Sequence, residues 1–210
     1  TMLCHGHEIE TAYISGVCTR PDIRRQNIGD NLMQQAHFRL YYRHCVAATL
    51  IPAEEWLYEW YAKCGYARCI TCTPPPADPR TTSFDDFDKA QRSLPCVLLH
   101  DSEGYDIIRE DIRLAGEAYR PAEKNIGAML RIINALKALQ LYASLHSDAK
   151  MTIRVHGDQH IPMNNAYFVL ADGNARQTDE PDSEARVMGI VELAEFIFGD
   201  EDARMNLMLN

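Results

Sequence analysis

The residues best suited to chemistry lie in one short segment, from Val17 to Gly29, where a predicted strand ends and a predicted helix begins. This segment carries two adjacent arginines, Arg24 and Arg25, at the expected start of the helix. Helix N-termini present free backbone N–H groups in a positive potential, and guanidinium groups add charge-assisted donors. The pattern therefore predicts a binding site for a phosphate-bearing ligand. The alternative is a capped helix whose basic first turn is simply solvated.

The elements around this segment follow from hydrophobic spacing. Short strands are predicted at 2–4 and 11–18, and apolar residues at helical spacing predict a helix over 26–44. The apolar run 46–51 predicts a buried strand, and a second helix is expected from Pro52 to Gly65, where glycine can form a left-handed cap. Residues 66–72 form a further predicted strand. Beyond a proline-rich stretch at 73–83, helices are expected at 84–92 and 106–114, followed by strands and two helices between 128 and 209.

Composition and charge exclude several classes of protein. The chain has 210 residues, of which 46% are apolar and 24% charged, as in ordinary globular proteins. The formal net charge of −9 disfavours nucleic acid as a partner. No apolar run is long enough to span a membrane, and the first residues do not form a signal peptide. Seven cysteines, mostly within apolar runs, are typical of reduced thiols, so we expect a cytoplasmic protein.

No metal site is expected from cysteine or histidine spacing. The pair Cys69 and Cys72 has metal or redox spacing, but no second ligand pair follows and Pro74 comes shortly after. The eight histidines are scattered along the chain.

Three motifs in order resemble the GCN5-related N-acetyltransferase (GNAT) superfamily. They are the strand ending Gly16-Val-Cys-Thr19, the loop Arg24-Arg-Gln-Asn-Ile-Gly29 and the helix end Glu59-Trp-Tyr-Ala-Lys-Cys-Gly-Tyr66. The resemblance implies a mixed α/β (α+β) fold and acetyl-CoA as cofactor. Arg24 and Gly29 match the ends of the family's phosphate-binding loop, and Asn27 stands where the family usually has glycine.

The resemblance also implies roles for individual residues. Backbone groups of Val17 and Thr19 would align the pantetheine, and backbone amides from Arg25 to Asp30 would hold the pyrophosphate. The cofactor-binding set is therefore Val17, Thr19, Arg24, Arg25, Gln26, Asn27, Gly29 and Asp30. Tyr61 matches the tyrosine that protonates the CoA thiolate, and a phenol has a suitable pKa for this. The alternative for Tyr61 is a plain core aromatic residue.

The C-terminal part is similar to the sterol-carrier-protein-like domain that ends Eis-type acetyltransferases. The similarity rests on residues 127–139, 187–199 and 205–210. It implies three units: the C-terminal half of a GNAT domain (1–73), a linker and helical connector (74–125), and a sterol-carrier-like domain (126–210). In Eis-type enzymes the chain's terminal carboxylate serves as base, which here would be that of Asn210; the alternative is a simple final strand.

The same resemblance implies that the N-terminal part of the GNAT domain is missing. The chain is then either a fragment of a longer protein or a truncated form whose edge strand is open. Eis-type proteins form oligomers, so a homo-oligomer is possible.

We therefore expect an acetyl-CoA-dependent N-acetyltransferase, an acyltransferase that moves an acetyl group to a primary amine by direct attack. The acceptor would be a small molecule or a peptide amine, and the acidic chain favours a cationic one. Two alternatives stay open. The chain could be a non-catalytic module that binds CoA or an apolar ligand, with a degenerate acetyltransferase half, or a structural domain without a ligand.

Overall fold

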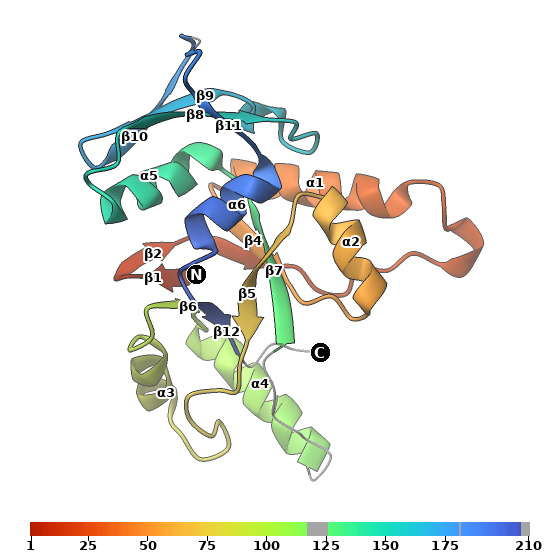
Figure 1. Cartoon of the computed structure of the whole chain (residues 1–210). Helices are drawn as coiled ribbons and strands as arrows, with labels where there is room; N and C mark the ends of the chain where they lie inside the picture. The colour runs from red at the N-terminus through yellow and green to blue at the C-terminus, as the bar shows by residue number, and fades with distance from the viewer. Residues whose placement is uncertain (117–125, 181, 207–210) are drawn as a thin grey trace.

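A computed structural model describes residues 1–116, 126–180 and 182–206 (Figure 1). The first half contains β1 (Met2–Cys4), β2 (His7–Ile9), β3 (Thr11–Tyr13), the 3₁₀ turn η1 (Pro21–Ile23), α1 (Ile28–Tyr42), β4 (Ala47–Leu50), α2 (Glu55–Lys63), β5 (Ala67–Cys72), α3 (Phe84–Gln91), β6 (Cys96–Leu98) and α4 (Ser102–Ala115). The second half contains β7 (Ile126–Ile132), α5 (Ala135–Leu145), β8 (Met151–His156), the 3₁₀ turn η3 (Pro162–Asn164), β9 (Tyr167–Ala171), β10 (Asn174–Thr178), β11 (Arg186–Gly189), α6 (Ile190–Phe198) and β12 (Ala203–Met205).

The larger sheet curls until its two edges meet. Its strand order is β2-β1-β6-β12-β5-β7-β4-β3, so β2 and β3 stand at opposite ends of the order. Only Glu10 separates these two strands in the chain, which brings the two edges together. Strands β3 and β4 are parallel, whereas β7 runs antiparallel to both β4 and β5. The segment that carries β2 and β3 therefore closes the sheet.

A second sheet, in the order β10-β9-β8-β11, covers one side of the molecule (Figure 1). Helices α5 and α6 lie between the two sheets, since α5 contacts β9 and β10 while α6 contacts β5 and β7. Their apolar faces share one hydrophobic core with both sheets. Asn134 caps α5, because its side chain accepts a hydrogen bond from the backbone N–H of Lys137 at 3.0 Å.

Helices α1 and α2 lie together at another edge of the larger sheet and close a smaller core. Met33 of α1 and Tyr58 of α2 are buried there with Leu50 of β4. Helix α2 ends at Lys63, and Gly65, directly after the C-cap residue Cys64, has a φ of +92°, as the predicted left-handed glycine cap requires. This pair of helices positions the candidate site.

The predicted mixed α/β fold with flanking helices is confirmed. The predicted strand 11–18 is shorter in the structure, because β3 ends at Tyr13. Strand β1 is not an edge strand, because it pairs with β2 on one side and with β6 on the other. None of the described helices is long and apolar enough to cross a bilayer.

The three predicted units stay a prediction. Strands β7 and β12 come from the expected carrier-like unit, yet both are hydrogen-bonded to β5 of the first unit. The two parts of the chain thus share one sheet.

Candidate functional site

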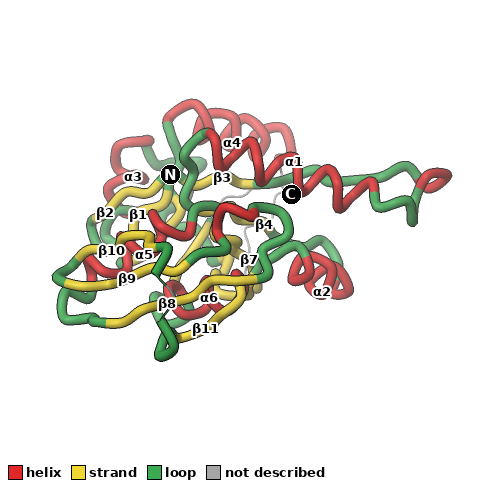
Figure 2. Tube along the Cα trace, turned by 90° about the horizontal axis from the view of Figure 1, so that it is seen from above, coloured by secondary structure: helices red, strands yellow, loops and turns green. Residues whose placement is uncertain are grey.

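Strands β3 and β4 separate at one point, and the separation opens a cleft. Their pairing continues to the bond from the Ile14 N–H to the Thr49 carbonyl, at 2.9 Å. Beyond it, within the described residues, no backbone hydrogen bond joins Val17 or Thr19 to β4. The chain here extends away from the rest of the molecule, as the view from above shows (Figure 2). Backbone groups of this segment are therefore available to a ligand that lies along it.

The loop before α1 presents free donors to the same cleft. Arg25 and Asn27 adopt positive φ values of 63° and 56°, and Asn27 is the N-cap of α1 without forming a side-chain capping bond. The first backbone N–H groups of a helix have no intrahelical acceptor, and here no cap satisfies them. Asparagine tolerates the left-handed region better than most residues, which explains how it stands in for glycine.

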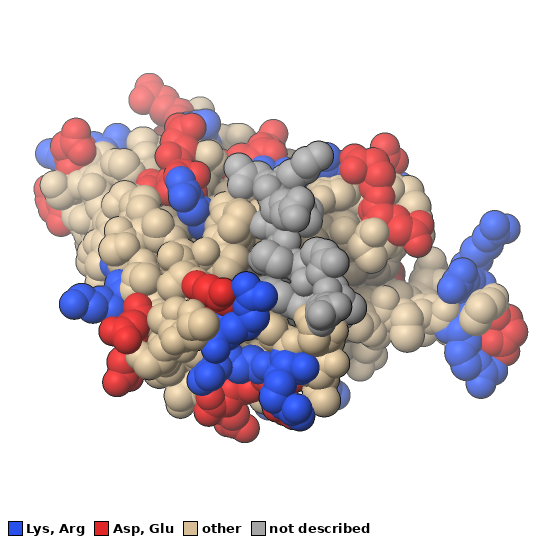
Figure 3. Space-filling view, turned by 90° about the horizontal axis from the view of Figure 1, so that it is seen from below, with Lys and Arg blue, Asp and Glu red and all other residues tan. Residues whose placement is uncertain are grey.

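The arginines of the loop have different roles. The Arg24 Nε–H donates to the Thr19 carbonyl at 3.0 Å and so braces the loop. Arg20 forms an ion pair with Asp22 at 2.6 Å. Arg25 is exposed and forms no hydrogen bond or ion pair with the described residues. Lys and Arg side chains gather on the projecting lobe that this loop forms (Figure 3). A local basic surface thus exists on a chain of net charge −9.

The cleft itself has a volume of about 640 Å³, a size common for small-molecule sites. Its walls are the segment 17–30 and one face of α2. Gly29 allows the two walls to approach, because a Cβ there would lie 3.2 Å from the Trp60 ring. The lining residues are Val17, Cys18, Thr19, Ile23, Arg24, Arg25, Asn27, Ile28, Gly29, Asp30, Glu54, Trp56, Leu57, Trp60 and Tyr61.

Tyr61 lies at the inner end of α2, where its ring packs edge-on against Trp60 and Tyr66, with centroids 4.8 and 5.7 Å away. Its hydroxyl forms no hydrogen bond with the residues that the structure describes. Burial raises the pKa of Tyr61, and the neighbouring Cys64 thiol adds to this rise. Tyr61 is therefore a protonated phenol that lines the cleft and can still donate.

The structure brings most of the predicted site residues together. Val17, Thr19, Arg24, Arg25, Asn27, Gly29, Asp30 and Tyr61 all line the cleft. Gln26 is exposed and lies outside the lining. Asn210 lies outside the described residues.

The aromatic wall of the cleft is not among the predicted site residues. Trp56 and Trp60 are the chain's two tryptophans, and both line the cleft. Their spacing of four residues places them on one helix face, a signal that was available in the sequence. Trp56 is 62% exposed, which is unusual for a large aromatic side chain that only packs a core.

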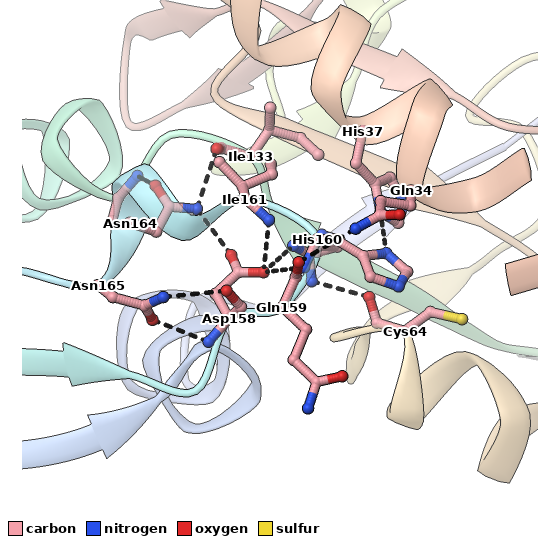
Figure 4. Close-up of polar contacts among 12 residues, drawn as sticks. Gln34, His37, Cys64, Ile133, Asp158, Gln159, His160, Ile161, Asn164 and Asn165 are labelled. Carbon is pink, nitrogen blue, oxygen red and sulfur yellow. Dashed lines mark hydrogen bonds and ion pairs between the residues drawn. The ribbon is translucent and has the colours of Figure 1, made fainter. Parts of the chain in front are cut away.

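A buried polar cluster lies behind this cleft; it consists of His37, Tyr66, Arg131, Asp158 and His160. Figure 4 shows His37, Asp158 and His160 of this cluster. The Arg131 guanidinium donates to the Asp158 carboxylate at 2.6 Å, and both side chains are only 1% exposed. The same carboxylate accepts the backbone N–H of His160 at 3.1 Å. Nδ1 of His37 lies 2.9 Å from Nδ1 of His160, and its Nε2 lies 2.9 Å from the Tyr66 hydroxyl.

Burial dominates the protonation states in this cluster. It lowers the pKa of His37 to about 2, with Arg131 adding to the effect, and it lowers the pKa of His160 as well. Burial also raises the pKa of the Tyr66 hydroxyl. Both imidazoles are therefore neutral, and the cluster holds its shape by hydrogen bonds between neutral groups around one ion pair.

Comparison with known proteins gives one family match. Residues 1–69 match the family model described as the acetyltransferase (GNAT) domain. The chain has a GNAT-like acetyltransferase fold. The crystal structure of Eis1 from Mycobacterium abscessus aligns with a TM-score of 0.58 and 13% identity over 94% of this chain and 75% of that one. A GCN5-related N-acetyltransferase from Anabaena variabilis aligns with a TM-score of 0.60 and 14% identity, over 97% of this chain and 83% of that one.

A third structure, a GCN5-related N-acetyltransferase from Kribbella flavida, aligns with a TM-score of 0.54 and 13% identity over 98% of this chain and 82% of that one. No curated protein sequence matches the chain. At sequence identities this low, the structural alignments support the GNAT-like fold and nothing beyond it. The segment that matches the family model contains the whole α1–α2 cleft.

Proposed function

We propose that the chain is an acetyl-CoA-dependent N-acetyltransferase whose cofactor lies in the α1–α2 cleft. The observation that carries the proposal is that one cleft contains both the uncapped backbone N–H groups of α1 and the Tyr61 hydroxyl. The N-terminus of α1, uncapped by Asn27, opens onto the same cleft as the Tyr61 hydroxyl. The matched GNAT segment supports the same assignment.

The residues present fit the chemical parts of acetyl-CoA. The uncapped N–H groups at the start of α1 suit a pyrophosphate, and so does Arg25, which has no partner among the described residues. The unpaired backbone of Val17 and the N–H of Thr19 suit the amide groups of a pantetheine arm. The Thr19 carbonyl is already used by Arg24, so Thr19 offers its N–H only. Trp56 and Trp60 supply apolar walls.

When bound, acetyl-CoA supplies an activated acetyl thioester, from which the amine nitrogen takes the acetyl group as the C–S bond breaks. Tyr61 donates its hydroxyl proton to the departing thiolate, a transfer suited to two groups of similar basicity. Burial of Tyr61 keeps it protonated until the transfer. The proton of the attacking amine goes to a base.

We assign the role of base to the terminal α-carboxylate at Asn210. This assignment rests on the resemblance to Eis-type enzymes alone, since Asn210 lies outside the described residues. The acceptor that we propose is a primary amine, on a small molecule or a peptide. The net charge of −9 favours a cationic acceptor through long-range attraction.

The carrier-like alternative has less support. A hollow of about 570 Å³ beside α6 and β11 is the candidate site for an apolar ligand. Its lining includes four acidic residues, Glu192, Glu195, Asp200 and Glu201. Burying an apolar molecule against several carboxylates would remove their hydration without replacing it. The described residues thus favour the acetyltransferase function over a site for an apolar ligand.

The direct test is titration of the intrinsic fluorescence with acetyl-CoA. Both tryptophans line the cleft, so ligand entry should change the emission without any label. Arg25→Glu should weaken binding about 30-fold, because it removes a charge-assisted contact and adds repulsion. The matched control is Arg43→Glu, the same charge change at the other end of α1, where Arg43 is exposed.

Arg43→Glu should leave the affinity within about twofold, because its charge lies at the far end of the helix and is screened. Equal losses in both variants would mean that only net charge matters and would overturn the cleft assignment. Absence of any emission change at saturating acetyl-CoA would also overturn it. Release of CoA in the presence of a polyamine, followed by mass spectrometry, then tests the transfer itself.

A further inference from the structure

A group of metal-ligating side chains lies where the buried polar cluster reaches the cleft. Asp30, in the first turn of α1, Cys64, at the end of α2, and His160, in the loop after β8, bring their donor atoms within 4.8 Å of one another. Oδ1 of Asp30 lies 3.3 Å from Nε2 of His160 and 4.0 Å from Sγ of Cys64. None of the three is close to another in the sequence.

We propose that Asp30, Cys64 and His160 bind a zinc ion. In tetrahedral Zn²⁺ sites, bond lengths of about 2.0 Å to oxygen and nitrogen and about 2.3 Å to sulfur place O and N about 3.3 Å apart and O and S about 3.5 Å apart. The Asp30–His160 spacing already has the first value, and the Cys64 thiol needs a shift of about 0.5 Å for the second. One thiolate, one imidazole and one carboxylate form a donor set that a borderline-soft ion accepts.

The surroundings hold two of the three ligands in place. The Arg131 guanidinium donates to the backbone carbonyl of Cys64 at 2.7 Å, and its partner Asp158 accepts the backbone N–H of His160 at 3.1 Å. One buried ion pair therefore fixes both residues at once. Cys64 is 2% exposed and His160 is 7% exposed, so these ligands lie in a dry site. Figure 4 shows how His160 is held between Asp158 and His37.

The third ligand faces solvent. The Asp30 side chain is 53% exposed, and Asp30 also lines the cleft. A three-ligand site that opens on one side leaves the fourth tetrahedral position to water. The ion would join α1 and α2 to the loop after β8, segments that otherwise meet here through hydrogen bonds.

An imidazole that binds zinc usually donates its other N–H to a neighbour, and His37 provides one. Without metal, the Asp30 carboxylate can only accept, so His160 carries its hydrogen on Nε2 and its Nδ1 accepts from Nδ1 of His37. Zinc on Nε2 requires the hydrogen on Nδ1 of His160, which then donates to His37. The hydrogen of His37 moves to Nε2, where the Tyr66 oxygen accepts it. Metal binding thus predicts a tautomer change in both rings.

A second group of possible ligands, Cys4, His5 and Glu201, provides an internal comparison. There the His5 imidazole lies within hydrogen-bond distance of the Glu201 carboxylate, and the Cys4 thiol lies 2.9 Å from the Cys96 thiol. The Cys4 thiol is thus engaged by another thiol, whereas within the described part of the chain the Cys64 thiol has only the 4.0 Å contact with Asp30.

The experiment uses the full chain with Co²⁺ as a spectroscopic probe and Zn²⁺ as competitor. Wild type should bind one equivalent of Co²⁺ with a thiolate-to-cobalt charge-transfer band, and Zn²⁺ should displace it. Cys64→Ser should lose the band, while Cys4→Ser, the matched control, should keep it. Asp30→Asn, at an exposed position that tolerates change, should weaken the affinity by more than the 10- to 100-fold that loss of an outer partner costs.

Absence of a charge-transfer band at saturating Co²⁺ would overturn the proposal. A band that survives in Cys64→Ser or disappears in Cys4→Ser would also overturn it, because it would place the metal elsewhere. Nitrogen-15 spectra of the histidine side chains give a readout that needs no variant. The tautomers of His37 and His160 should both change on adding Zn²⁺, and unchanged tautomers would contradict binding at His160.

Discussion

The α1–α2 cleft and the buried polar cluster lie back to back and use their polar groups in opposite ways. In the cleft, the first N–H groups of α1 have no cap, and Arg25 and the Tyr61 hydroxyl form no bond with the described residues. In the cluster, Asp158 alone accepts from Arg131, from Asn164 and from two backbone N–H groups. The unused donors leave the cleft able to bind a ligand. In the cluster, the Nε of Arg131 has no partner among the described residues, but the other hydrogen bonds hold the cluster rigid. The cluster therefore forms a rigid wall behind the cleft, and the cleft residues remain available to a ligand.

The largest expected effect is on catalysis, from Tyr61→Phe. Loss of a general acid should lower turnover about 100-fold or more while acetyl-CoA affinity by tryptophan fluorescence stays within about twofold. A general acid works only when protonated, and burial raises the pKa of Tyr61. Wild-type turnover should therefore persist to alkaline pH and fall only as the pH rises beyond about 10. The fall should be absent in Tyr61→Phe.

Tyr58→Phe is the matched control on the same helix. The Tyr58 hydroxyl donates to the Gly127 carbonyl at 2.6 Å and does not line the cleft. This variant should lose about 1 kcal/mol of stability and keep its turnover. Similar turnover losses in both variants would mean that Tyr61 is only a packing residue.

The next effect is on stability, and it differs between a glycine beside the buried polar cluster and a glycine in open space. Gly65 has a φ of +92°, and a Cβ there would overlap with the Arg131 guanidinium. Gly65→Ala should therefore cost about 3 kcal/mol or more in the free energy of unfolding, measured with urea, since it strains the backbone and displaces a buried ion pair.

Gly157→Ala provides the comparison, because Gly157 has a φ of +75° but a Cβ there meets nothing within 4 Å. It should cost only the backbone strain, about 1–2 kcal/mol. Equal losses of unfolding free energy in both variants would show that the Arg131–Asp158 ion pair can move aside without loss of stability.

A third effect is the pH dependence of stability. Burial lowers the pKa of His37 to about 2, below the value of about 6.5 in an unfolded chain. The unfolded state therefore binds an extra proton as the pH falls below about 6.5. Stability is complete above that pH and decreases by about 1.4 kcal/mol per pH unit below it for this one group. Burial of His100 and His160 acts in the same direction.

Chemical unfolding at several pH values measures this slope. Below pH 6.5, His37→Gln should reduce the slope by about 1.4 kcal/mol per pH unit, the contribution of one proton. His7→Gln, at an exposed position on β2, should leave the slope unchanged. A slope that His37→Gln does not alter would mean that His37 is not the buried neutral group described here.

These two regions also differ in how far the sequence predicts them. The cleft comes from residues 17–61, a continuous stretch, so strand, loop and helix signals indicated its position and most of its lining. The cluster joins His37, Arg131 and Asp158 across more than 100 residues, and no spacing in the sequence predicts such contacts. The closure of the large sheet was missed for the same reason, because it depends on β6 and β12 pairing with distant strands.

The smallest effect tests the loop conformation on which the cleft depends. Asn27 has a φ of 56° at the start of α1, where glycine adopts the same conformation without strain. Asn27→Gly should therefore change stability by less than about 1 kcal/mol and acetyl-CoA affinity by less than about fivefold. Asn27→Val should lose about 1–2 kcal/mol, because a β-branched side chain avoids this region. Thermal unfolding and fluorescence titration measure both changes. If valine were tolerated as well as glycine, the left-handed turn would not be what opens the N-terminus of α1 to a ligand.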